Sequence, residues 1–156
     1  MTKKLTPIQI VEQGDPSGCG IACLAMILCR SYESVKDDLE KSLGWRHGKE
    51  TFYTKPPTLV DYLVRCGISA KKCKFGGWNN LDGTALLGVN SNAGKYHWIV
   101  VIRNKTSFLI IDPETAEVHQ GSEWANFADG GYVTNARSPY ICLPEHSVTH
   151  IAIAAV

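Results

Sequence analysis

The sequence lacks both a cluster of basic residues and an apolar run long enough to cross a membrane. Its 16 lysines and arginines nearly balance 15 acidic residues, for a formal net charge of +1, and they are scattered rather than gathered into a nucleic-acid or membrane-surface patch. The longest strongly apolar stretches, residues 21–29 and 151–156, fall short of the roughly 18 to 20 residues of a membrane span. The N-terminus lacks the apolar core of a signal peptide. We therefore expect a cytoplasmic protein, or one delivered to its target as an effector, with no nucleic-acid and no membrane partner.

The cysteines lack the spacing of a disulfide framework or of a zinc site. Structural metal sites bring their ligands in close pairs such as CxxC, and the sequence contains no such pair. Most of the cysteines stand among leucine, isoleucine and valine. We expect reduced thiols, no bound metal and no cofactor. The six are Cys19, Cys23, Cys29, Cys66, Cys73 and Cys142.

What is present is the composition of a folded domain. The chain has 156 residues, of which 44% are hydrophobic and 20% charged, enough for one sizeable core and too few for two ordinary domains. It has no internal repeat and no low-complexity tract. We predict one domain over residues 1–156.

Helical periodicity fills the first half of the chain. Apolar residues at helical spacing predict a helix from about Cys19 to Arg30, with Ser17 or Asp15 available to cap its first turn. A second helix is predicted over residues 34–44, where a glycine stops it, and a third from a Thr58 cap to a second terminal glycine at residue 67.

Short segments rich in branched residues follow, separated by Gly, Asn and Asp, and they predict strands. The segment Trp98–Val101 is apolar on both faces, so we expect it to be central and covered on both sides. Residues 121–128 predict one or two helical turns, and the last strand could pair within the sheet or with a second copy, which leaves the oligomeric state open. Helices before an antiparallel sheet make an α+β fold, with the N-terminal helices packed on the sheet. The predicted strands are residues 68–75, 84–90, 96–103, 107–113 and 150–156.

One polar turn delivers a cysteine to the start of an apolar helix, in the segment QGDPSGCGIACLAMI of residues 13–27. A helix N-terminus presents unpaired N–H groups and a partial positive charge, which favour a thiolate over a thiol. Cys19 is therefore our candidate nucleophile. Cys23 follows one helical turn later, and we expect it to be a core residue, with a redox partner as the alternative.

A cysteine nucleophile needs a base, and of the five histidines only His97 stands at the head of a predicted central strand. A two-residue turn at residues 104–105 would place His97 directly opposite Asp112, with Cβ atoms about 5 Å apart. The carboxylate could then accept a hydrogen bond from the imidazole. A three-residue turn would instead place Pro113 opposite His97.

Two further groups of residues suit this chemistry. The amide N–H of Gln13 and the backbone N–H of Cys19 would form an oxyanion hole, in which one donor lowers the reaction barrier by roughly 3 kcal/mol. Aromatic-rich stretches at residues 44–53 and 75–80 supply Trp45 and Trp78 as candidate substrate-binding residues, with packing under loops as the alternative.

The order of these motifs resembles a known family. Gln13, then Cys19 with the helix CGIACLAMI, then strands beginning HWIVV and ending IIDP, are similar to the papain-like cysteine peptidases that trim double-glycine leader peptides from bacteriocins. Those peptidases often form the N-terminal domain of ATP-binding-cassette exporters. The resemblance covers about residues 8–120 and implies a papain-like α+β fold.

The resemblance also implies a role for each candidate residue. Cys19 would be the nucleophile, His97 the general base, Asp112 the residue that orients it, and Gln13 the oxyanion donor. The chain departs from the family pattern at Gly18, where an acidic residue is usual. No exporter segment follows, so we expect a standalone domain, and the double-glycine preference does not carry over.

These observations predict a cysteine peptidase or isopeptidase acting on a peptide or protein. Cys19 would attack an amide carbonyl, His97 would protonate the leaving amine, and water would release the acyl-enzyme. Two alternatives remain open. The same residues serve an acyltransferase, transglutaminase-like enzyme or deamidase, and an inactive member of this fold would only bind peptides.

Overall fold

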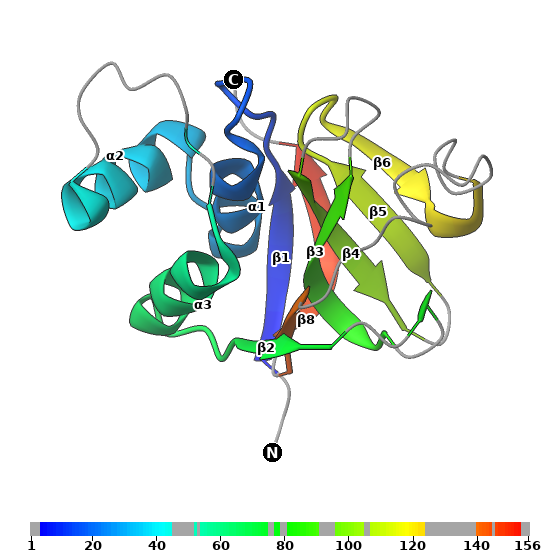
Figure 1. Cartoon of the computed structure of the whole chain (residues 1–156). Helices are drawn as coiled ribbons and strands as arrows, with labels where there is room; N and C mark the ends of the chain where they lie inside the picture. The colour runs from blue at the N-terminus through cyan, green and yellow to red at the C-terminus, as the bar shows by residue number, and fades with distance from the viewer. Residues whose placement is uncertain are drawn as a thin grey trace.

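The computed structural model describes residues 4–44, 52, 54–74, 77–78, 81–90, 96–104, 107–123, 140–144 and 146–153. Figure 1 shows the helices gathered on one flank of the molecule and the larger sheet on the other, with β1 (Lys4–Ile10) next to α1 (Cys19–Leu28). The predicted α+β arrangement, with N-terminal helices packed on an antiparallel sheet, is confirmed. Among these residues, none of the helices combines the length and apolarity needed to cross a membrane.

Helix α1 is the central helix, and nearly all of its surface is covered. Every residue from Cys19 to Ile27 is buried, as expected of a helix that packs between other elements rather than along one stripe. It begins at Gly18, without a side-chain cap. The predicted caps are wrong because both are engaged elsewhere: Ser17 Oγ accepts the N–H of Phe52 at 2.7 Å, and the carboxylate of Asp15 accepts the hydroxyl of Tyr32.

The two outer helices begin earlier than predicted. Helix α2 (Tyr32–Leu43) starts after Ser31, whose hydroxyl accepts the N–H of Ser34 at 3.1 Å, and ends at Gly44 in the left-handed conformation (φ 66°). Helix α3 (Pro56–Arg65) begins at a proline, whose fixed φ suits the first helical turn, so the predicted Thr58 cap lies inside it.

The larger sheet has six strands in the order β2-β7-β3-β4-β5-β6, and all its strand pairs are antiparallel. The predicted strands are all present, some of them shorter or shifted by a few residues. Strands β6 and β7 were not predicted, since each has only four residues. The six strands are β2 (Lys71–Cys73), β3 (Gly83–Asn90), β4 (Tyr96–Arg103), β5 (Phe108–Asp112), β6 (Glu117–Gln120) and β7 (Tyr140–Leu143).

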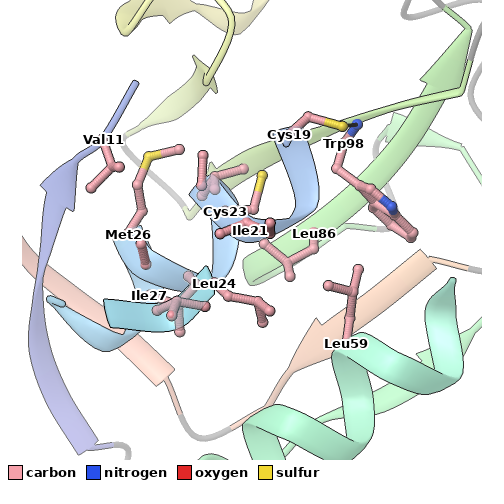
Figure 2. Close-up of a cluster of buried hydrophobic side chains, with 14 of the residues drawn as sticks. Val11, Cys19, Ile21, Cys23, Leu24, Met26, Ile27, Leu59, Leu86 and Trp98 are labelled. Carbon is pink, nitrogen blue, oxygen red and sulfur yellow. Dashed lines mark hydrogen bonds between the residues drawn. The ribbon is translucent and has the colours of Figure 1, made fainter. Parts of the chain in front are cut away.

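Strand β4 is central and covered on both faces, as its apolar sequence predicted. Its even-numbered residues pack with α1 in one cluster, and its odd-numbered residues Ile99 and Val101 belong to a second cluster on the other face. Figure 2 shows Trp98, at the start of β4, beside the α1 residues of the first cluster. The start of β4 is thereby fixed against the first turn of α1.

A second, two-stranded sheet joins the two ends of the described chain. Strand β1 pairs in parallel with β8 (His146–Ile153). The late strand therefore pairs within the chain, outside the six-stranded sheet. The predicted turn after residue 121 is present as a 3₁₀ turn over Gly121–Glu123, and its later residues, 124–128, lie outside the described part.

Candidate active site

Cys19 occupies the first position of α1 and is only 4% exposed. Its sulfur accepts a hydrogen bond from the backbone N–H of Trp98, at 3.3 Å, and Figure 2 shows the two residues adjoining at the end of the helix. The first turn of α1 carries no acidic side chain and no side-chain cap, so the partial positive charge of the helix N-terminus is not offset there. This is the environment in which reactive cysteines are found.

His97 and Asp112 form a buried pair. His97 Nε2 lies 2.9 Å from Asp112 Oδ1, and the residues are 6% and 5% exposed. Burial acts to lower the pKa of His97, but hydrogen bonds and charge interactions with Asp112 and Cys19 outweigh it and raise the pKa to about 10. The ring is therefore protonated at neutral pH, and it is hydrogen-bonded to the side chains of both Asp112 and Cys19.

The pair forms through a strand register other than the predicted one. Val100 pairs with Ile111 and Arg103 with Phe108, so four residues rather than two link β4 to β5, and the predicted direct pairing of His97 with Asp112 is wrong. The cause is the turn, in which Asn104 accepts the N–H of Ser107 through its side chain, at 2.9 Å.

The register differs by two positions, which keeps every side chain on its expected face of the sheet. His97 and Asp112 are therefore diagonal neighbours on one face, and this separation is within reach of two long side chains. The predicted contact is present because the register is shifted by an even number of residues, which leaves both side chains on the same face of the sheet.

The end of β5 is tied to the loop that precedes α1. The backbone N–H of Gln13 donates to the carbonyl of Pro113 at 2.8 Å, and the backbone N–H of Glu114 donates to Asp112 Oδ1 at 2.9 Å. The first bond ties the chain next to Asp112 to the segment that carries Cys19, and the second orients the Asp112 carboxylate. Three segments far apart in the sequence thus meet at one place.

The side chain of Gln13 lies within its own loop. Its Nε2 donates to the carbonyls of Asp15 and Pro16, each at 3.0 Å. Its Oε1 is buried and has no hydrogen-bond partner among the described residues. The amide therefore braces the turn that leads to Cys19, and both of its N–H groups are engaged.

Tyr32 holds the same loop from the other side. Its hydroxyl donates to Asp15 Oδ2 at 2.6 Å, and Lys36 lies 3.2 Å from the same oxygen. Burial, followed by the hydrogen bond to Asp15, raises the pKa of Tyr32. A Cβ at Gly18 would overlap the Tyr32 hydroxyl, and one at Gly14 would lie 2.7 Å from its ring, which explains both glycines. Sequence reasoning missed Tyr32 because nothing in the local pattern links it to a loop 17 residues away.

The aromatic candidates lie only in part among the described residues. Trp45 and Tyr53 lie outside the described residues. Phe52 is buried in the core, 3% exposed. Trp78 is half-buried and stacks on Phe108, with ring centroids 5.6 Å apart.

The strand register shows how far Trp78 stands from His97. Phe108 pairs with Arg103, six positions along β4 from His97. At about 3.3 Å per residue, Arg103 lies roughly 20 Å along the strand from His97, and Trp78 packs against Phe108 at that far end. This contact favours the alternative in which Trp78 packs under a loop.

One group of side chains in the described part has metal-ligand spacing. The ligand atoms of His97, Asp112 and Glu114 lie within 4.8 Å of one another. Asp112 Oδ1 already accepts hydrogen bonds from His97 and from the backbone of Glu114. A hydrogen bond thus accounts for the approach of His97 to Asp112, and the third side chain, Glu114, is exposed.

Comparison with known proteins gives a family and a fold. Residues 7–124 match the Peptidase C39 family. Among solved structures, the crystal structure of the peptidase domain of Streptococcus mutans ComA is similar, with a TM-score of 0.56 and 18% sequence identity over 85% of this chain and 96% of that one. No curated protein matches. At this identity the structural likeness shows the fold.

Proposed function

Because the chain belongs to the Peptidase C39 family, as its motifs predicted, we propose that it is a cysteine peptidase that hydrolyses a peptide or related amide bond. Cys19 is the nucleophile, His97 the general acid and base, and Asp112 the residue that orients and charges His97. The observation that carries the proposal is the buried His97–Asp112 pair beside the N-terminus of α1, where Cys19 stands. Buried ionisable groups of this kind are costly for stability and concentrate at functional sites.

The raised pKa of His97 suits it to act as the general acid in the first half of the reaction. At neutral pH the ring carries a proton, so it is ready to protonate the amine that leaves when Cys19 attacks the carbonyl. Asp112 stabilises that charge through Nε2 at 2.9 Å. In the second half, the neutral ring takes a proton from water as the water attacks the thioester of the acyl-enzyme.

The oxyanion of the tetrahedral intermediate needs donors near Cys19. The backbone N–H of Cys19 is one, since it stands at the uncapped start of α1. We assign Gln13 as the other. Its Nε2 stands in the loop that leads to Cys19, and it must release the carbonyl of Asp15 or Pro16 to reach the substrate.

The experiment that tests the proposal is site-resolved alkylation of all six cysteines with iodoacetamide, followed by mass spectrometry, from pH 5 to 9. Cys66 is exposed and serves as the reference thiol, while Cys23 is the buried reference. We expect Cys19 to react faster than Cys66 well below pH 8, and His97→Ala to abolish that advantage. A Cys19 that reacts no faster than Cys66 in the native protein would refute the proposal.

A second step separates hydrolysis from the alternative reactions of the same residues. Incubation with a peptide library, with and without an added amine, is read by mass spectrometry against the Cys19→Ala variant. Cleaved peptides support a peptidase. Amine-modified or deamidated side chains would instead indicate acyl transfer or deamidation, and binding without any product an inactive domain.

A further inference from the structure

Two cysteines outside the active site lie in direct contact. Cys73 is the last residue of β2 and Cys142 lies in β7, and the two sulfur atoms are 2.6 Å apart although the residues are separated by 69 positions in the sequence. Both are partly buried, and both lie near the carbonyl oxygen of Lys71, at 3.9 and 3.7 Å.

The strand register explains the contact. In the antiparallel pair of β2 and β7, Lys71 is opposite Cys142 and Cys73 is opposite Tyr140. The two cysteines are therefore diagonal neighbours on one face of the sheet. A disulfide has an S–S distance of about 2.05 Å and requires the two Cβ atoms to point toward each other. The two sulfur atoms are already 2.6 Å apart and need to approach by only about half an ångström, so joining them requires little movement of the strands.

We propose that Cys73 and Cys142 are an oxidation site, at which a disulfide oxidant such as oxidised glutathione forms an intramolecular disulfide between β2 and β7. The other four cysteines have different surroundings. Cys19 and Cys23 are buried in the core, and Cys29 and Cys66 are exposed. The site shares no residue with Cys19, His97 or Asp112, so it stands or falls independently of the proposed peptidase activity.

The reaction is two successive thiol–disulfide exchanges. The Cys73 thiolate attacks one sulfur of oxidised glutathione, forms a mixed disulfide and releases one glutathione thiolate. The Cys142 thiolate then attacks the Cys73 sulfur and releases the second glutathione. Each leaving thiolate takes up one of the protons that the two cysteines lose, so the protein loses two electrons and two protons and one oxidised glutathione becomes two reduced ones.

The surroundings of Cys142 favour this order of attack. Burial, followed by the hydrogen bond and the charge of Cys73, raises the pKa of Cys142 to about 12. Because the thiolate is the nucleophile, Cys142 is disfavoured as the first to react, and we assign the first attack to Cys73. Once Cys73 carries glutathione it has no negative charge, and one cause of the raised pKa of Cys142 is removed. The second thiol then loses its proton more readily.

The bond would attach an edge strand to the sheet. Strand β2 has three residues and stands at the edge, paired with β7 alone, and β7 pairs with β3. A link between residues 69 positions apart removes many conformations from the unfolded chain. For a protein of this size we expect the melting temperature to rise by about 10 °C on oxidation.

The test uses the full chain, reduced and then incubated with oxidised glutathione, quenched with iodoacetamide and mapped by mass spectrometry without reduction. We expect one peptide pair linking Cys73 to Cys142, a loss of two hydrogens in the intact mass, and reversal by dithiothreitol. The melting temperature should rise with the bond. Cys73→Ser and Cys142→Ser should each abolish both effects, while Cys66→Ser, at an exposed cysteine, should retain them.

The wild-type map decides the proposal even if a serine variant fails to fold. A persistent glutathione adduct on Cys73 or Cys142 would overturn it, because it would mean that the partner sulfur is out of reach. A link from either residue to another cysteine or to a second copy would also overturn it. So would a bond that forms without raising the melting temperature, since the strands would then have to distort to make it.

Discussion

Two cysteines on one helix, a single turn apart, have opposite surroundings. Cys19 begins α1, accepts the backbone N–H of Trp98 and interacts with the charged ring of His97. Cys23 is fully buried among apolar side chains (Figure 2). Burial, followed by the charges of Cys19 and Asp112, raises the pKa of Cys23 well above its ordinary value. The difference shows that the helix end and its polar neighbours, rather than the thiol itself, determine which cysteine can react.

The largest expected effect comes from removing each thiol in turn. Cys19→Ala should lower peptide cleavage by about 10⁴-fold or more, because the nucleophile is gone, while the melting temperature changes little. Cys23→Ala should retain most of the activity and lose about 1 to 2 kcal/mol of stability through the small cavity that it leaves. Cleavage assays and thermal unfolding of both variants check the contrast. Loss of activity in a folded Cys23→Ala protein would show that Cys23 takes part in the reaction.

The different surroundings of Cys19 and Cys23 could be predicted from the sequence because both depend on local patterns. A polar turn before an apolar helix locates Cys19 at the helix end, and helical spacing puts Cys23 in the core. His97 was recognised because it heads a strand that is apolar on both faces. These features depend on residues close together in the chain, as do the three helices and β4.

The parts that could not be predicted depend on single side chains or on distant pairing. The register of β5 is set in a turn where two hydrogen bonds join Asn104 and Ser107, one through the Asn104 side chain and one between the backbones, and no alternation pattern encodes them. Strand β1 was not among the predicted strands, since its parallel pairing with β8 joins opposite ends of the chain. The contacts of Tyr32 with the loop before Cys19 likewise join two elements that the local pattern does not connect.

The next largest effect tests the polar surroundings of Cys19 through Asp112. Asp112→Asn keeps the shape but removes the negative charge beside His97, so the pKa of His97 should fall and cleavage should drop by about 100-fold or more. The pH profile of Cys19 alkylation should shift together with cleavage. Glu114→Gln is the matched control, since it removes a negative charge that also lies within 4.8 Å of His97 and Asp112 but is exposed and makes no described hydrogen bond to either. Equal losses in the two variants would argue against a specific role for Asp112.

A smaller effect is expected from Tyr32, as a positioning residue for the loop before Cys19. Tyr32→Phe keeps the ring against Gly14 and Gly18 but removes the 2.6 Å bond to Asp15. We expect kcat to fall about 10-fold with KM nearly unchanged, because the oxyanion donors lose their alignment. Alkylation of Cys19 should keep its rate, since that displacement forms no oxyanion.

The control for Tyr32 is a second tyrosine–aspartate pair on the helical side. Tyr62 donates to Asp38 at 2.9 Å and accepts from Arg30 at 2.6 Å, away from the site. Tyr62→Phe should lower the melting temperature by a similar amount without changing kcat. If both variants lose kcat in parallel with stability, Tyr32 has only a structural role.

The smallest effect is the pH dependence of stability, which reports the surroundings of His97 directly. The folded pKa of His97 is raised to about 10, above the ordinary value of about 6.5. Its contribution to stability is therefore complete below about pH 6.5 and is lost as the pH rises toward 10. His97→Gln lacks this contribution, so the difference in melting temperature between wild type and variant should shrink by roughly 5 to 9 °C from pH 6.5 to 8.5. Cys23 is present in both proteins, so its own titration cancels in the difference. A difference that stays constant across the window would mean that His97 is neutral in the folded protein. The proton that the leaving amine receives would then have to come from Cys19 during the reaction.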